Sequence, residues 1–393
     1  MTINNEHKKL NVPNLRFPEF EGEWEEYRIE DITENISSGR CKSHSSSGKY
    51  NLYGSTGIIG KTNEACYEGN LVLVARVGAN AGSLQILNEP CGITDNTLII
   101  KPKEVDVQYI YYFLQHFNLN RLIFGSGQPL ITGGMLKKVK VSLGTIQEQN
   151  KITRLLSILD ERIATQNKII EDLKKLKSAI IEKVFCSPNQ KNPMCRIEGF
   201  EQALSTYKMS DFSSRIATKN KDSKCSLVLT IAAQYGLVNQ ESFFNKSVAS
   251  ENLTGYYLLH KGEFAYNRSY SAGYDWGAVK RLDNYDEGVL STLYICFKIN
   301  ETIVDSDYLT YYFESTKWHR GLSDIAGEGA RNHGLLNVSI TDYFNTKHRF
   351  PVIEGQKAIA KMLNTITEKE RKATLLGECY QKQKQYLLRQ MFI

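Results

Sequence analysis

The chain contains no apolar run long enough to cross a bilayer, and its first ten residues lack the apolar core of a signal peptide. Its 8 cysteines form no C-x-x-C pair, so the sequence offers neither a zinc ribbon nor a redox motif. We expect structural thiols, no bound metal, no membrane association and a location in the cytoplasm.

Motifs for catalysis and nucleotide binding are missing as well. The run from Gly54 to Thr62 ends like a phosphate-binding loop, but Ser55 stands where the first glycine of that motif should be. The chain contains neither Asn-Pro-Pro-Tyr nor Asp-Pro-Pro-Tyr, which an amino-methyltransferase needs to hold a flipped adenine. Its 7 histidines have no evident Ser or Cys nucleophile beside them. These independent absences predict a binding protein without catalytic residues.

A long charged helical pattern is present twice. Residues 147–185 are repeated 207 positions later as residues 354–392, and the aligned pairs include Gln149 with Gln356 and Phe185 with Phe392. The segments before the two helices also match, since Tyr27 and Tyr207 open similar runs. Self-similarity on this scale predicts two homologous globular units. Such a pseudo-dimer suits a target that itself has two separated halves.

Each unit is predicted to be α+β. Short apolar runs bounded by Gly, Asn and Pro predict strands at 71–76 and 97–100, with counterparts at 263–268 and 292–297. A short aromatic helix follows at 109–114 and again at 308–313. The predicted order along the chain is a first unit at 1–146, a long helix at 147–186, a linker at 187–196, a second unit at 197–353 and a second long helix at 354–393.

Apolar residues recur in the two long helices at alternating spacings of four and three, which is typical of a left-handed coiled coil. Lys177 and Lys384 interrupt the two helices at the same aligned position, and either point outward to water or form a polar layer that fixes the pairing. The predicted seam consists of Ile152, Leu156, Leu159, Ile163, Ile170, Leu173, Ile180 and Val184, with Ile359, Leu363, Ile366, Tyr380, Leu387 and Met391.

The helix pattern breaks at Cys186-Ser187-Pro188, and a linker of about ten residues would let the second helix return antiparallel to the first. A helix of about 38 residues spans roughly 57 Å. Half-sites on B-DNA recur about every 34 Å, so a helix pair of this length could set a gap of several base pairs.

Polar and aromatic loop residues supply candidate DNA contacts. The net charge of +6 is compatible with a polyanion but does not demand one. Arg reads guanine, Asn and Gln read adenine, and Lys neutralises phosphate, although each such residue could equally be a solvated loop residue or a local turn partner. The candidates are Arg40, Lys42, Lys49, Tyr53, Ser55, Thr56, Lys61, Arg76 and Asn80 in the first unit, and Gln234, Asn267, Arg268, Tyr270, Tyr274, Trp276, Lys280, Arg331 and Asn332 in the second.

Several of these segments resemble a known family. Tyr50-Asn51-Leu52-Tyr53-Gly54-Ser55-Thr56-Gly57-Ile58-Ile59-Gly60 and the run from Arg76 to Ser83 are similar to a target-recognition domain of a Type I restriction-modification specificity subunit. Gln147-Glu148-Gln149 resembles the usual start of the conserved helix of that family, and Glu354-Gly355-Gln356 is its second copy, with Gly355 departing from the commoner acidic residue. The likeness covers essentially the whole chain. The second unit has a different loop, Leu229 to Val238, so the two units should read different sequences.

The resemblance implies a non-catalytic subunit that reads an asymmetric, bipartite target in double-stranded DNA. It also implies that the long helices dock two methyltransferase subunits, which use S-adenosylmethionine, and that two ATP-dependent, Mg-using restriction and translocase subunits join them. No cofactor would be bound by this chain. The alternatives are a free-standing DNA-binding or regulatory coiled-coil protein, and an enzyme that acts alone.

Overall fold

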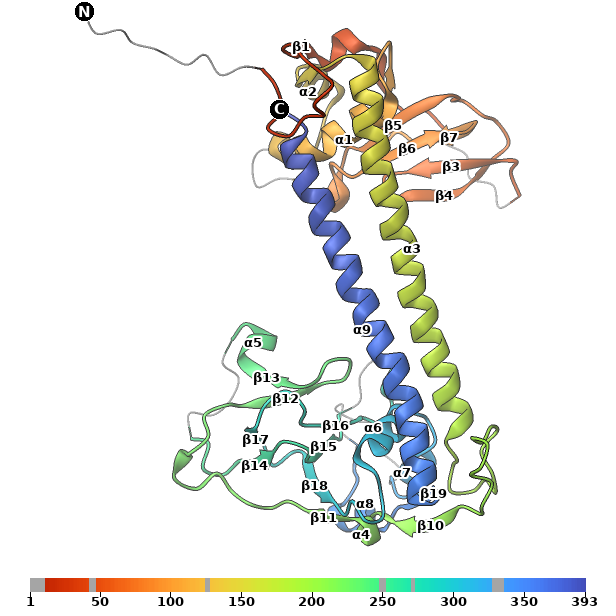
Figure 1. Cartoon of the computed structure of the whole chain (residues 1–393), viewed down its shortest axis with the longest axis vertical. Coiled ribbons are helices and arrows are strands. Elements are labelled where there is room, and N and C mark those ends of the chain that lie inside the picture. The colour runs from red at the N-terminus through yellow and green to blue at the C-terminus, as the bar shows by residue number, and fades with distance from the viewer. Residues whose placement is uncertain (1–10, 42–46, 124–127, 247–251, 270–272, 327–335) are drawn as a thin grey trace, which may run out of the picture. The chain divides into compact units, whose positions relative to one another are not determined.

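The computed structural model describes residues 11–41, 47–123, 128–246, 252–269, 273–326 and 336–393. The chain forms two compact units, whose elements are labelled in Figure 1. Unit 1 comprises residues 1–168 and 374–393, and unit 2 comprises residues 169–373. These limits differ from the predicted domain boundaries because each long helix is divided between the two units. Within the described ranges, no helix is both long enough and apolar enough to span a membrane.

The described residues of unit 1 form three small sheets. Strand β1 (Glu25–Arg28) pairs antiparallel with β9 (Lys140–Leu143). An antiparallel sheet of four strands has the order β2 (Thr33–Ser38), β8 (Thr97–Pro102), β5 (Asn70–Ala75) and β6 (Leu84–Asn88). A third sheet has the order β4 (Gly57–Thr62), β3 (Tyr50–Gly54) and β7 (Cys91–Ile93), in which β3 and β7 are parallel.

The central strand β5 explains the core of unit 1. Its run Leu71-Val72-Leu73-Val74-Ala75 is buried at every position, because both faces of this strand are covered. Val72 and Val74 contact the cluster that includes α1 (Val107–Phe117), whereas Leu71 and Leu73 contact the cluster that includes Tyr53 and Ile93. The short helices of unit 1 are η1 (Ile29–Ile32), η2 (Gly78–Asn80), η3 (Leu119–Leu122) and α2 (Gly133–Lys137).

Unit 2 repeats this plan. Strand β10 (Ser205–Lys208) pairs with β19 (Lys347–Phe350), and a four-stranded sheet has the order β11 (Ser213–Arg215), β18 (Ile295–Ile299), β15 (Phe264–Asn267) and β16 (Ala278–Arg281). A hairpin joins β12 (Leu229–Ala232) to β13 (Gly236–Asn239), and a separate antiparallel pair joins β14 (Tyr257–His260) to β17 (Glu287–Leu290). The helices are α4 (Met209–Phe212), η4 (Lys221–Ser223), α5 (Gln240–Phe244), α6 (Ser306–Glu314), α7 (His319–Ser323) and α8 (Ile340–Asn345).

The aromatic helices α1 and α6 are held in the same way in both units. Asp106 caps α1 by accepting a hydrogen bond from Tyr109 N, and Asp305 caps α6 by accepting one from Tyr308 N. The buried amide of Gln149 accepts from the backbone N–H of Asp106, at 3.4 Å, and Gln356 accepts from that of Asp305, at 2.9 Å. The sequence repeat is therefore a repeat of hydrogen bonds, and the predicted α+β class is confirmed in both units.

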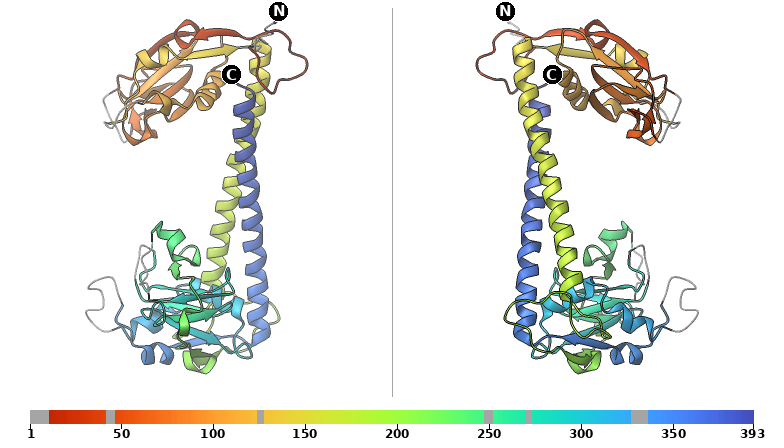
Figure 2. Two further views of the ribbon diagram at one scale, coloured as in Figure 1. Left: turned by 90° about the vertical axis from the view of Figure 1, so that its left-hand side faces the viewer. Right: turned by 90° about the vertical axis from the view of Figure 1, so that its right-hand side faces the viewer.

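The long helices α3 (Ile146–Val184) and α9 (Ile353–Gln390) pair antiparallel within each unit. In unit 1 the buried residues Ile152, Leu156 and Leu159, from the start of α3, contact Leu387 and Met391, from the end of α9; Tyr380 packs against the same cluster. Both views of Figure 2 show the end of α9, in blue, beside the start of α3.

In unit 2 the opposite ends of the two helices meet, again in antiparallel orientation. Val184 at the end of α3 is buried with Ile359 and Leu363 from the start of α9, and Ile180 packs against this cluster. Of the remaining predicted seam residues, Ile366 is buried, whereas Ile163, Ile170 and Leu173 are half-buried.

The two lysines that interrupt the seam form ion pairs with the opposite helix. Lys384 Nζ lies 2.6 Å from Asp160 in unit 1, and Lys177 Nζ lies 3.1 Å from Glu370 in unit 2. Both ammonium groups are largely shielded from solvent, so neither lysine simply points outward to water. Removing one partner of such a shielded pair would leave the other charge uncompensated, which makes the polar layer a constraint on the pairing register.

In each unit, the segment that leads to the first strand is hydrogen-bonded to the end of a long helix. Leu15 N–H donates to Gln390 O in unit 1, and Cys195 N–H donates to Lys183 O in unit 2, both at 2.9 Å. In unit 1 the Arg16 guanidinium also binds the buried Glu148 carboxylate through two hydrogen bonds, of 2.8 and 2.9 Å.

In unit 2 the corresponding contact is apolar packing instead of an ion pair. Gly355 occupies the position of Glu148, and a side chain there would lie 3.4 Å from the Phe200 ring. The departure of Gly355 from the usual acidic residue is thus explained by Phe200, which fills the space beside it.

His348 provides a pH-dependent test of the unit 2 core. Its ring is buried, hydrogen-bonded to Tyr312 and Thr346, and burial lowers its pKa to about 3. The unfolded chain binds a proton on this histidine near pH 6.5, so stability is fully present above that value and falls as the pH decreases toward 3, by up to about 1.4 kcal/mol per pH unit. We expect His348→Gln to flatten this slope in urea unfolding of unit 2 between pH 6.5 and 5. Parallel pH profiles for the wild type and the variant would contradict the assignment.

Candidate nucleic-acid interface

The candidate residues of unit 1 gather at the β3–β4 hairpin and the loops beside it. Tyr53 and Lys61 lie on the two strands, and Ser55 and Thr56 form the two-residue turn between them. Lys49 is exposed just before β3, with its ammonium 5.2 Å from the centre of the Tyr50 ring. Arg40 is exposed after β2, and Asn80 is exposed at the end of η2. Lys42, Tyr270, Arg331 and Asn332 lie outside the described residues.

The hairpin contains a β-bulge. Leu52 lies opposite Gly60 and Tyr53 opposite Ile58, so Ile59 is an extra residue in β4. Bulges redirect side chains, and here two adjacent isoleucines are both exposed, Ile58 by 57% and Ile59 by 43%. In the sequence, two adjacent isoleucines between Gly57 and Gly60 depart from the alternation of apolar and polar residues in a half-buried strand. This departure is the signal that could have identified them.

A chain of hydrogen bonds crosses the hairpin. Lys61 Nζ donates to Asn51 Oδ1 at 2.9 Å, Asn51 Nδ2 donates to Glu89 Oε1 at 2.8 Å, and the Tyr53 hydroxyl donates to the same oxygen at 2.6 Å. The hydrogen bond from Tyr53 is the largest cause of a lowered pKa at Glu89. Burial and this contact raise the pKa of Tyr53 to about 12. Asn51 and Glu89 were not among the predicted residues, because Glu89 is 36 positions from Tyr53 in the sequence.

Arg76 and Arg268 end equivalent strands and are bound to their own units. Arg76 Nη1 donates to Ser38 Oγ at 3.1 Å, and Arg268 donates to the carbonyls of Leu293, at 3.1 Å, and Val338, at 3.2 Å. The carbonyl of Arg76 accepts from Ile131 N–H, and that of Arg268 accepts from Leu336 N–H. Both arginines therefore position loops of their own unit, and the structure shows a local role for each guanidinium.

The candidates of unit 2 divide into exposed and inward groups. Gln234 is exposed in the β12–β13 turn beside Tyr235, which is 69% exposed. Asn267 Oδ1 accepts from Ser269 N–H, and the Tyr274 hydroxyl donates to Ala233 O.

Trp276 and Lys280 belong to the inward group. Trp276 packs against the buried core of unit 2. Burial lowers the pKa of Lys280, whose charged neighbours are Glu314 and Lys177. Two basic residues that were not predicted contact Tyr257. Arg215 donates to the Tyr257 hydroxyl at 3.0 Å, and the Lys219 ammonium lies 4.0 Å from the centre of the same ring.

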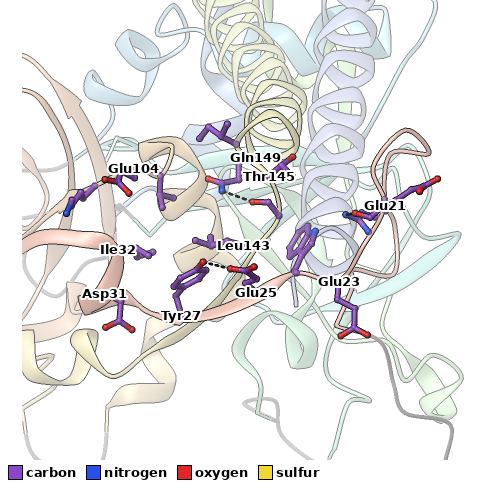
Figure 3. A pocket seen from close by; sticks show the side chains of 16 residues that line it. Glu21, Glu23, Glu25, Tyr27, Asp31, Ile32, Glu104, Leu143, Thr145 and Gln149 are labelled. Atoms are coloured by element: carbon purple, nitrogen blue, oxygen red, sulfur yellow. Dashed lines mark hydrogen bonds between the residues drawn. The ribbon is translucent and has the colours of Figure 1, made fainter.

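A pocket of about 440 Å³ in unit 1 lies away from these candidates and is acidic. Figure 3 shows Glu21, Glu23, Glu25, Asp31 and Glu104 around it. Arg16 also lines it, but the guanidinium of Arg16 is bound to Glu148. Carboxylates repel phosphate, so this pocket does not suit a polyanion. Within the described ranges, no three His, Cys, Asp or Glu side chains are grouped closely enough to hold a metal ion.

Comparisons with known proteins agree with this architecture. Residues 21–175 match the family described as the Type I restriction modification DNA specificity domain. The crystal structure of the Type I restriction-modification S subunit from M. genitalium has the same fold, with a TM-score of 0.62 at 16% identity, over 97% of this chain and 99% of that one. Residues 21–175 thus resemble the specificity domain of Type I restriction-modification systems, and the fold resembles that of an S subunit.

Sequence relatives within the specificity family match parts of the chain. The specificity subunit of the Type I restriction enzyme MjaVIII from Methanocaldococcus jannaschii is 29% identical over 202 residues, which are 47% of this chain and 46% of that protein. The specificity subunit of EcoprrI from Escherichia coli is 25% identical over 144 residues, or 36% of this chain and 33% of that protein. The matched segment thus spans less than half the length of each of these relatives.

The structural role of Arg76 can be separated from a direct role in binding. Arg76→Ala removes donors to Ser38 Oγ and to the loop carbonyl of Asp95, so we expect it to lower the free energy of unfolding by about 1–3 kcal/mol. The exposed Arg40 is the matched control, since Arg40→Ala should change stability by less than about 0.5 kcal/mol. Urea unfolding of both variants measures this difference. Equal stabilities would show that the Arg76 guanidinium does not hold the loop.

Proposed function

We propose that this chain reads DNA sequence for a Type I restriction-modification assembly and catalyses no reaction itself. One observation carries this proposal: a chain whose residues 21–175 match the specificity domain contains a similar plan twice, with different side chains on the corresponding hairpins. The unit 1 hairpin contains Tyr53, Ile58 and Lys61, whereas the unit 2 hairpin contains Thr230, Tyr235 and Val238. Different side chains recognise different base edges, so the target is bipartite and asymmetric.

The partner subunits supply the chemistry in this proposal. Two methyltransferase subunits dock on the outer faces of α3 and α9, and two restriction and translocase subunits join them. S-adenosylmethionine, ATP and Mg²⁺ are bound by those partners, and this chain binds none of them. Exposed apolar side chains on the otherwise charged helices support a docking role: Ile158, Leu375, Leu376 and Tyr386 in unit 1, with Ile169 and Leu176 in unit 2.

The long helices also fix the spacing of the two half-sites in this proposal. Helices α3 and α9 contain 39 and 38 residues. At the usual rise of an α-helix, each is about 57 Å long. The ion pairs of Lys384 and Lys177 resist sliding of one helix along the other, so the gap between the half-sites is a property of the helices and is independent of which bases are read.

Exchange of residues 197–353 for those of a family member with another target tests both points. We expect one half of the methylated sequence to change, while the other half and the gap stay the same because unit 1 and both helices are retained. Mapping of methylated adenines, in cells that also express the methyltransferase subunit, measures the outcome. A change in both halves would contradict modular reading. A chain that neither co-purifies with the methyltransferase nor alters the methylation pattern would instead support the free-standing DNA-binding protein.

A further inference from the structure

The carboxylate of Glu89 occupies an unusual place for a surface that approaches DNA. Glu89 follows β6 and precedes β7, and because β7 pairs in parallel with β3, the acid is brought beside the β3–β4 hairpin. Tyr53 and Asn51 both donate to Glu89 Oε1, and among the described residues none donates to Oε2. One oxygen of an ionised, oriented carboxylate is therefore left for an external donor.

The neighbouring groups are oriented as well. Because Asn51 Nδ2 donates to Glu89, its Oδ1 faces Lys61, whose ammonium keeps two further N–H donors. In the ladder Asn51 lies opposite Lys61, and Tyr53 lies opposite Ile58. Alternate residues of a strand share a face, so Asn51, Tyr53, Ile58 and Lys61 lie on the same face of the hairpin.

Ile58 stays on this face because the bulge removes Ile59 from it. Ile59 packs over Gly54, where a β-carbon would lie 3.0 Å from its side chain. Ile58 is left with 57% of its surface exposed next to the polar groups. One face of the hairpin thus combines a carboxylate acceptor, an ammonium donor and a bare aliphatic side chain.

This combination suits base edges better than the sugar–phosphate backbone. A phosphate would repel the Glu89 carboxylate, and an isolated apolar residue gains nothing beside it. The major groove admits a two-stranded β-ribbon and presents amino donors on cytosine and adenine, acceptors on guanine and the methyl group of thymine. Each of the three groups of the hairpin face has a partner among these features.

We propose that this hairpin face enters the major groove of the half-site read by unit 1, where Glu89 accepts a hydrogen bond from the amino group of a cytosine or an adenine. Lys61 donates to an acceptor of a neighbouring base, and Ile58 contacts a thymine methyl. Tyr53 is a positioning residue that orients the carboxylate. This assignment rests on the proposed DNA-reading function.

Glu89→Gln is the direct test, made in the full chain with its methyltransferase partner on a library of randomised target sequences. Glutamine keeps an oxygen for Tyr53 and Asn51 but turns the second oxygen into a donor. We expect the preference at one base pair of one half-site to fall roughly 5- to 100-fold, with the other half-site unchanged. Tyr53→Phe should weaken the preference at the same base pair. Glu68→Gln, at an exposed acid of the same unit, is the matched control and should leave every preference unchanged.

Three outcomes would overturn the assignment. The first is an unchanged base preference at every base pair in Glu89→Gln. The second is a uniform loss of base preference across both half-sites in a variant that keeps the wild-type unfolding temperature. The third is an equal change of base preference in Glu68→Gln. Should Glu89→Gln unfold, the exposed Ile58→Ala variant decides. A preference for thymine must then fall at one position of one half-site only, and no change refutes the face. A wild-type complex without any sequence preference would instead refute the proposed function itself.

Discussion

A phenylalanine just after the end of each long helix completes the core of the unit in which that helix ends. Phe392 lies in unit 1, with its ring 5.1 Å from that of Tyr109. Phe185 lies in unit 2, with its ring 5.0 Å from that of Tyr308. Because α3 begins in unit 1 and α9 begins in unit 2, each unit is built from its own repeat together with the helix end of the other repeat. The aromatic helices therefore cannot be fully buried by one repeat alone.

The sharing of helix ends between the two repeats is consistent with the other contacts that occur in both units. Gln149 and Gln356 join the start of each long helix to the capping aspartate of an aromatic helix, so the beginning of one helix and the end of the other meet at the same element. The ion pairs of Lys384 and Lys177 then set the register of the two helices within each unit.

The sequence revealed what depends on periodicity and duplication. The heptad spacing and the repeat of residues 147–185 predicted both long helices within three residues of their ends. An apolar run predicted the central strand β5, because a strand covered on both faces contains few polar residues. The correspondence between the two units then predicted β15. The aligned glutamines and phenylalanines were visible as pairs, although their partners on α1 and α6 were not.

The proposed recognition surface was harder to predict because it depends on which strands pair. Glu89 meets Tyr53 only through the parallel pairing of β3 with β7, and no local pattern encodes that pairing. Arg76 and Lys280 are of residue types that contact DNA, yet one binds loop groups of its own unit and the other is half-buried beside Glu314. Residue type gave candidates for the surface, whereas the tertiary contacts decide which of them face outward.

Hydrogen exchange of Phe392→Ala in the full chain tests the exchange of helix ends most directly. Loss of a buried phenylalanine costs about 3–5 kcal/mol, so amides of α1, at 107–117, should exchange faster while those of α6, at 306–314, keep their wild-type rates. Phe185→Ala should give the reverse pattern. Unchanged protection of α1 in Phe392→Ala, or equal losses in both helices, would contradict the account.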